Sequence, residues 1–243
     1  MNKAKRKIIT GAIAVVCAVG GMSAISVIGN KAEKGSVPVS LSSFDTQKPV
    51  VILDAGHGGI DGGCTSAEGV PEKGINLNIL LRLRDLLRIS GYEVIVTRDT
   101  DMSIHDKGVE GIANQKSSDM DNRLELFNSR NDAICISIHQ NQFTEPKYKG
   151  AQMFYSDNNS KSETLARSLQ GNFRRLIQPD NEREIKLCGK ELFLCYYSQN
   201  PTVMVECGFL SNPDEAALLN TEEYQGKVAF TIFSGINEYV NQK

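Results

Sequence analysis

The chain lacks the cysteine pattern of a metal-binding or disulfide-rich module. No two of its six cysteines form a CxxC pair, which argues against the zinc knuckles that such pairs build. Five of them lie beyond residue 34, an odd and scattered set that is not typical of a secreted disulfide framework. Cys135 lies inside an apolar run and is expected to be a small core residue. A bridge between Cys188 and Cys195 stays open at this point.

A cluster of basic side chains is also missing from most of the chain. Six of the 27 Lys and Arg residues, but only one of the 29 Asp and Glu residues, lie in the first 34 positions. The remainder carries 21 basic and 28 acidic side chains, a net charge of about −7. Phosphate contacts supply most of the affinity for nucleic acids. We therefore expect no nucleic-acid partner.

The first 34 residues differ in composition from the rest. Four basic residues precede a charge-free stretch over residues 8–29: Lys3, Lys5, Arg6 and Lys7. Such an arrangement is typical of an export signal, and the stretch is about long enough to span a membrane. Residues 1–34 are interpreted as a cleaved signal peptide or a retained anchor, the only part expected to contact the membrane. Residues 35–48 are then a polar linker, and residues 49–243 one exported domain.

Beyond the linker, apolar runs alternate with helical patterns. The runs predict strands at VVILD (50–54), YEVIVTR (92–98), AICISIH (133–139), AQMFYS (151–156) and TVMVE (202–206), with a weaker one near LFLCYY (192–197). Helices are predicted over residues 75–87, 121–129, 161–177 and 222–240. This alternation predicts an α/β fold with a mixed, mostly parallel central sheet and helices on both faces.

Three of the predicted strands end in a residue that can bind a metal or move a proton. The first strand leads to His57, the third ends at His139, and TVMVE ends at Glu206. The chain holds only three histidines, and two of them occupy this kind of position. Sites in such sheets form beyond the carboxyl ends of parallel strands. We therefore expect these three side chains to lie together.

Two imidazoles and a carboxylate suit a catalytic zinc ion with a fourth position open to water. A second carboxylate must then accept the proton of that water and pass it to the leaving group. Spacing alone does not fix the third ligand, because Asp61, Glu68 and Glu72 all lie between the first strand and the first helix. His105 lies in a polar loop with no strand to place it, and we do not expect it in the site.

Further motifs accompany these residues in a fixed order. They are LDAGHGGIDGG, a following EK, a TR with a nearby Asp, SIHQN, GAQMFY and VECGFLSNPDE. In order and spacing they resemble the zinc-dependent N-acetylmuramoyl-L-alanine amidases of the amidase_3 type, over about residues 50–240. The resemblance implies the phosphorylase/hydrolase-like fold of that family. It also implies that His57, Glu72 and His139 bind one zinc ion and that Glu206 is the catalytic carboxylate. Asn141 is a weaker candidate for lining the substrate groove.

The resemblance implies a substrate and a setting as well. The amide between the lactyl group of N-acetylmuramic acid and the L-alanine of the stem peptide would be hydrolysed. The insertion after Arg98, SIHQN and GAQMFYS are similar to the sporulation and germination branch of the family. That implies action on spore-cortex glycan, on the route to muramic δ-lactam, in the forespore intermembrane space and cortex.

The segment 140–150 is too short for the inhibitory helix of the division amidases of this family. Targeting or activation is therefore expected from the N-terminal segment, from the time of synthesis, or from a partner protein. Two alternatives stay open. One is a zinc peptidase that cuts within the stem peptide, and the other is an inactive wall-binding module on the same fold.

Overall fold

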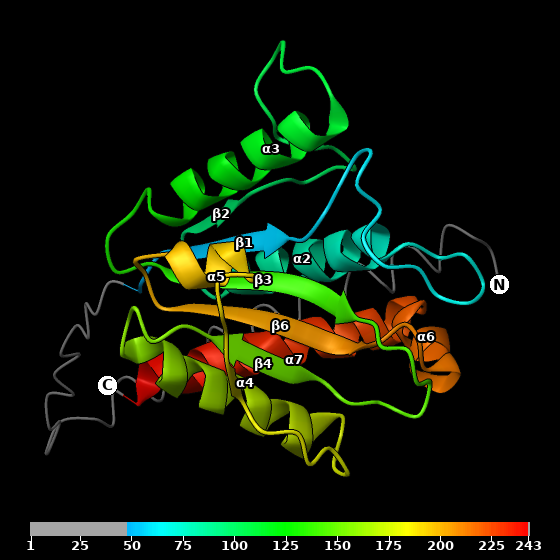
Figure 1. The fold of residues 1–243 in the computed structure, drawn as a ribbon. Coiled ribbons are helices and arrows are strands. Elements are labelled where there is room, and N and C mark those ends of the chain that lie inside the picture. The colour runs from blue at the N-terminus through cyan, green and yellow to red at the C-terminus, as the bar shows by residue number, and fades with distance from the viewer. Residues whose placement is uncertain (1–47, 243) are drawn as a thin grey trace, which may run out of the picture. The chain divides into compact units, whose positions relative to one another are not determined.

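A six-stranded sheet forms the middle layer of the fold (Figure 1). The computed structural model describes residues 48–242 and gives the strand order β2-β1-β3-β6-β4-β5. The strands are β1 (Val51–Ala55), β2 (Val94–Val96), β3 (Ile134–Asn141), β4 (Gln152–Tyr155), β5 (Lys186–Leu187) and β6 (Thr202–Phe209). All neighbours are parallel except β4 and β6. The predicted mixed, mostly parallel sheet is confirmed.

Helices cover both faces of this sheet. One face packs against α2 (Glu72–Ile89), α4 (Lys161–Leu176) and α7 (Glu222–Asn241). The other face, toward the viewer in Figure 1, packs against α3 (Ile112–Phe127) and α5 (Phe193–Tyr197). The helix α6 (Pro213–Leu219) follows β6. The larger core lies on the α2 side, and each fully buried aliphatic side chain there contributes about 1.5–3 kcal/mol.

Alternation along the central strands sends polar side chains to the α3 side. Leu53 and Val205 are fully buried in the larger core, so their neighbours Asp54 and Glu206 point to the opposite face, because successive side chains of a strand alternate. His139 lies directly beside Glu206 in the pairing of β3 with β6. Since β1, β3 and β6 are parallel, their carboxyl ends meet at one edge. The functional candidates gather at that edge.

The predicted strand at residues 192–197 is wrong. This segment forms the helix α5, in which the Tyr196 and Ser198 N–H groups donate to the carbonyls of Leu192 and Leu194. The outer strand next to β4 is β5 instead, two residues long. Hydrophobicity alone does not separate a short buried helix from a short buried strand, and LFLCYY is such a case.

The helix α3 is nine residues longer at its start than the sequence predicted. Its buried residues are Asp119, Arg123 and Phe127, spaced by four. Two of these three are charged, so a search for apolar periodicity does not detect the buried face. The helix α6 was not predicted.

The described cysteines are all free, including Cys188 and Cys195. Cys135 is fully buried in the core, as predicted. The predicted signal segment 1–34, and the linker 35–48 apart from Lys48, lie outside the described residues. None of the helices in residues 48–242 is both long enough and apolar enough to cross a membrane.

Candidate active site

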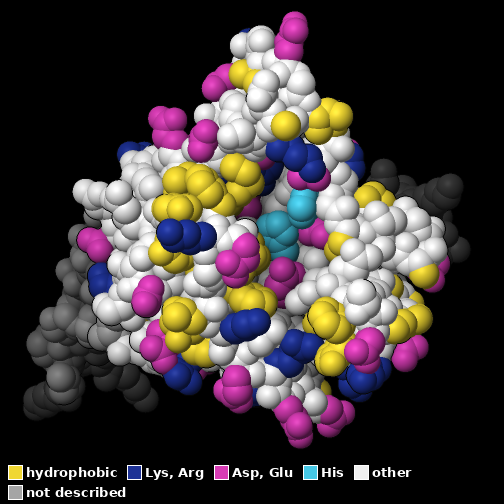
Figure 2. Space-filling model, in the orientation of Figure 1, with side chains coloured by type: hydrophobic (Ala, Val, Ile, Leu, Met, Phe, Trp, Pro, Cys, Tyr) yellow, Lys and Arg dark blue, Asp and Glu magenta, His cyan; other side chains and the backbone are white. Residues whose placement is uncertain are grey.

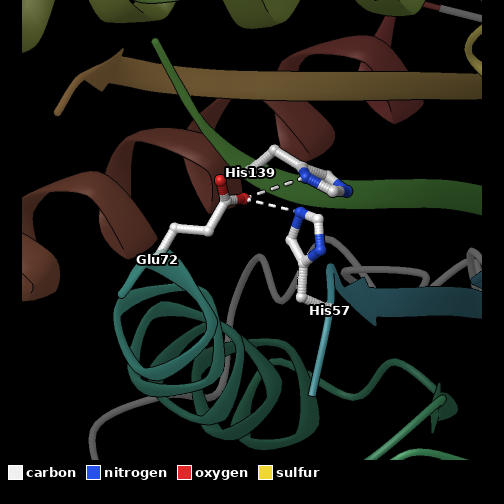
Figure 3. Close-up of side chains that lie close together, drawn as sticks. All are labelled: His57, Glu72 and His139. Atoms are coloured by element: carbon white, nitrogen blue, oxygen red, sulfur yellow. Dashed lines mark hydrogen bonds and ion pairs between the residues drawn. The ribbon is translucent and has the colours of Figure 1, made fainter. Parts of the chain in front are cut away.

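Three side chains from separate elements meet beyond the carboxyl ends of β1 and β3 (Figure 3). His57 comes from the loop after β1, Glu72 is the first residue of α2, and His139 lies in β3. Oε1 of Glu72 is 3.1 Å from Nε2 of His57 and 3.1 Å from Nδ1 of His139. Of the three carboxylates that spacing left open, Glu72 is the one beside both imidazoles, whereas Glu68 is exposed.

The backbone of the β1–α2 loop makes this meeting sterically feasible. His57 has a φ of 64°, in the left-handed region that non-glycine residues rarely occupy. A Cβ on Gly56 would lie 2.1 Å from Cε1 of His139, and a Cβ on Gly63 would lie 2.3 Å from Cγ of Glu72. The two glycines are therefore required because functional side chains pack directly on the loop.

Glu72 is oriented by hydrogen bonds to both of its carboxylate oxygens. The Cys64 N–H donates to Oε2 at 2.9 Å, and Nδ2 of Asn76 donates to Oε1 at 3.1 Å. Burial on its own raises the pKa of Glu72, but hydrogen bonds from His139 and His57 outweigh burial and hold this pKa well below its usual range. The carboxylate is therefore ionised and its Oε1 faces both imidazoles.

His57 is held from its other nitrogen by Asp61. Nδ1 of His57 lies 3.0 Å from Oδ2 of Asp61, and Nζ of Lys116 donates to Oδ1 of Asp61 at 3.0 Å. Because a carboxylate only accepts, Nδ1 carries a proton and Nε2 is directed at Glu72. Burial by itself lowers the pKa of His57, but the hydrogen bonds with Glu72 and Asp61 raise it to about 9.

The residues of this group fit a divalent cation. Two ligands that each lie 2.0–2.1 Å from a tetrahedral zinc ion are about 3.3 Å apart, close to the 3.1 Å separations seen here. One ligand atom from each of His57, Glu72 and His139 lies within 4.8 Å of the others. The group can therefore hold a metal ion.

Glu206 lies next to this group with part of its bonding capacity unused. Its backbone lies directly beside that of His139 in the pairing of β3 with β6. Its side-chain Oε2 is buried with no hydrogen-bond partner among the described residues. Burial raises the pKa of Glu206 to about 7, against the effect of the nearby His139. A carboxyl group with a pKa near 7 can accept and return a proton at neutral pH.

A second cluster of buried charge lies beneath the site. Nη1 and Nε of Arg123 donate to Asp54 and to Asp119, and Nη2 donates to the His57 carbonyl at 2.8 Å. Asp54 also accepts hydrogen bonds from Thr97 at 2.8 Å and from Ser137 at 2.6 Å. This cluster fixes the unusual backbone of His57.

Sequence reasoning did not identify Asp54 or Arg123 as part of the site's support. The signal available was the acidic residue at the end of the apolar run VVILD. An ionised carboxylate beside buried aliphatic residues needs a partner, and that partner is 69 positions away in the sequence.

A cavity of about 280 Å³ is lined by the two histidines of the group, His57 and His139. Figure 2 shows histidine atoms at the bottom of a hollow on this face, next to acidic side chains. Met204 and Glu206 line the cavity from the sheet, Lys116 from α3 and Phe193 from α5. Asn141 ends β3 and does not line this cavity.

His105 bonds to Ser103 and lies outside the group, in keeping with the expectation that it is not a site residue.

An α/β sheet that holds two histidines and a carboxylate beside an unpaired glutamate is typical of metal-dependent hydrolases. The sequence profile of the amidase_3 family of N-acetylmuramoyl-L-alanine amidases matches residues 51–238. The chain therefore belongs to this metal-dependent family, as the motifs indicated.

Two relatives lie in the predicted sporulation and germination branch. The chain is 36% identical to the germination-specific N-acetylmuramoyl-L-alanine amidase of Bacillus subtilis, over 83% of this chain and 87% of that protein. The structure of the CwlD amidase from Clostridioides difficile in complex with the GerS lipoprotein superposes with a TM-score of 0.77 at 38% identity, covering 81% of this chain and all of that one. AmiA of Escherichia coli is more distant, at 28% identity over 79% of this chain and 76% of that protein.

Proposed function

We propose that this protein is a zinc-dependent N-acetylmuramoyl-L-alanine amidase of the spore cortex. It hydrolyses the amide that joins N-acetylmuramic acid to the L-alanine of the stem peptide. The observation that carries this proposal is the convergence of His57, Glu72 and His139 on one point, with the partly unpaired Glu206 beside them. His57, Glu72 and His139 hold the zinc ion. Asn141, at the end of β3 and outside the cavity, contributes to the part of the substrate groove that extends beyond it.

Different side chains have different roles in this reaction. Bound zinc supplies Lewis acidity and a water molecule with a pKa of roughly 7. Glu206 accepts a proton from the attacking water, and then donates a proton to the departing alanine nitrogen. Asp61 keeps the His57 ring in the orientation that the site needs, because it fixes which nitrogen carries the proton.

Two relatives support the proposed setting. One is named germination-specific, and another was solved with a lipoprotein. We infer that residues 1–34 export or anchor the protein, that residues 35–48 are a linker, and that the catalytic domain at 49–243 acts outside the membrane on cortex glycan. A partner protein that targets or activates it belongs to the same proposal.

The test compares wild type with Glu206→Gln on purified peptidoglycan, with bound zinc measured alongside. Wild type should release peptides with a free L-alanine amino terminus and leave bare muramic acid. The variant should lose about 10²–10⁴-fold in rate, the usual contribution of a general acid–base, and should keep its zinc. Glu223→Gln, an exposed carboxylate on α7, is the matched control and should behave as wild type.

The other outcomes are informative. Peptides cut internally would identify a peptidase. A wild-type protein that binds peptidoglycan without releasing products would identify an inactive wall-binding module. Equal product profiles for wild type and Glu206→Gln would remove the role given to Glu206.

A further inference from the structure

Two aromatic side chains on the short helix α5 lie side by side. The ring centres of Phe193 and Tyr197 are 4.9 Å apart, and the ring of Tyr196 lies 4.9 Å from that of Tyr197. Residues four positions apart share one face of a helix, so Phe193 and Tyr197 lie one turn apart on the same face. The helix contains no charged residue. Phe193 and Tyr197 are called the aromatic row below.

The aromatic row begins inside the catalytic cavity and continues outside it. Phe193 lines the same cavity as His57 and Glu206. Tyr197 lies outside the cavity lining and is 43% exposed. Figure 2 shows hydrophobic side chains gathered on the surface beside the hollow that holds the histidines. A substrate whose amide lies in the cavity can therefore extend over the row.

The core holds this helix in place, so the row is formed before a ligand binds. Leu194 is 2% exposed and packs in a core cluster with Phe127 of α3. Cys195 is fully buried. The Asn158 side chain donates a hydrogen bond to the Tyr196 carbonyl. Because the backbone under the row is fixed, binding there costs little conformational entropy.

The charges in the cavity favour a neutral ligand over an anionic one. Its basic lining residues, Lys116 and Arg123, are each paired with carboxylates. Glu191, two positions before Phe193, also lines the cavity and has no ion pair within residues 48–242. A carboxylate brought to this end of the row would meet an uncompensated negative charge, which is unfavourable.

We propose that the aromatic row binds the glycan of the substrate, with the muramic acid ring on Phe193 and the next sugar on Tyr197. This inference rests on the proposed function, in which the scissile amide joins a sugar to a peptide. The stem peptide carries free carboxylates, whereas N-acetylated sugars are neutral and the muramic carboxyl group is consumed in the amide. One face of a sugar ring presents C–H groups, which pack on the negative face of an aromatic ring. The row therefore fits the glycan better than the peptide.

The test measures kcat and KM of the zinc-loaded protein on two synthetic substrates with the same stem peptide. One carries it on a single N-acetylmuramic acid, and the other on the internal muramic acid of a tetrasaccharide. Wild type should have a kcat/KM about threefold to tenfold higher on the tetrasaccharide, the effect of one stacked ring. Tyr197→Ala should remove this advantage by raising KM at unchanged kcat, and should leave the single-sugar substrate unaffected. Phe193→Ala should lower kcat/KM on both substrates.

A matched control and a folding check accompany these variants. Phe230→Ala removes an exposed ring on α7, which covers the opposite face of the sheet, and should keep the wild-type ratio of the two kcat/KM values. A thermal unfolding curve is measured for each variant. Where Tyr197→Ala does not fold, Tyr197→Leu takes its place; it lacks the flat ring and should lower the ratio as well.

Equal kcat/KM of wild type on both substrates, or an unchanged ratio in the folded Tyr197 variant, would overturn the inference while the amidase proposal would survive. A third substrate, the tetrasaccharide with its stem shortened to L-Ala–D-Glu, separates glycan from peptide. A loss in Tyr197→Ala that appears only with the full stem would assign the row to the peptide and overturn the inference. Wild type that cleaves none of the substrates would refute the amidase proposal, and this inference with it.

Discussion

Two clusters of buried charge lie on the same face of the sheet and differ in how completely their members are paired. The lower cluster is the one around Asp54 and Arg123, and the upper cluster is formed by His57, Glu72, His139 and Glu206. In the lower cluster, both oxygens of Asp54 accept hydrogen bonds, and Arg123 donates from all three nitrogens. In the upper cluster, two imidazoles compete for one oxygen of Glu72, and Glu206 keeps a buried oxygen without a partner among the described residues.

This difference separates a structural role from a chemical one. Buried polar groups are costly unless they are paired. In the lower cluster they are paired, and its role is to support the loop after β1. The incomplete pairing in the upper cluster is not explained by a contribution to folding. It has room for a cation between His57, Glu72 and His139, and Glu206 has a free oxygen for a proton. Two variants test this division.

Breaking the lower cluster should have the larger effect, and the effect should be on stability. Arg123→Met removes the guanidinium and leaves Asp54 buried without its charged partner, which should cost about 3–5 kcal/mol. Urea unfolding of the metal-free protein measures this loss. Arg82→Met, which removes a more exposed arginine paired with Glu222, should cost at most about 1 kcal/mol. Similar losses for both variants would mean that the lower cluster is not the structural one.

Loosening the upper cluster should have a smaller effect, on metal binding rather than on stability. Asp61→Asn keeps the size of the side chain but removes the charge that fixes the His57 ring, so zinc affinity should fall about 10–100-fold. Competition with a chromogenic chelator measures the affinity. Asp85→Asn, on the exposed side of α2, should not change it. Zinc affinity within twofold of wild type would remove the positioning role of Asp61.

The sequence predicted the upper cluster far better than the lower one. Apolar runs that end in a histidine or a glutamate can be recognised from the sequence alone, and the parallel sheet brings those ends together. Glu72 could not be chosen from spacing, since its distance to the imidazoles depends on the path of the β1–α2 loop; the family resemblance was needed to choose it.

The lower cluster escaped prediction for a related reason. Arg123 lies on a helix whose buried face is largely charged, so hydrophobic periodicity gives no signal for it. Contacts between polar residues far apart in the sequence depend on the completed fold.

The central claim is that the upper cluster is a metal site, and a measurement of bound zinc tests it most directly. Purified protein is loaded with zinc, passed over a desalting column and analysed for metal by elemental mass spectrometry. Wild type should retain about one zinc ion per chain, since three protein ligands make a stable catalytic site. His139→Ala should retain almost none, while Arg167→Ala retains as much as wild type. Full zinc occupancy in His139→Ala, with the protein folded, would contradict the account.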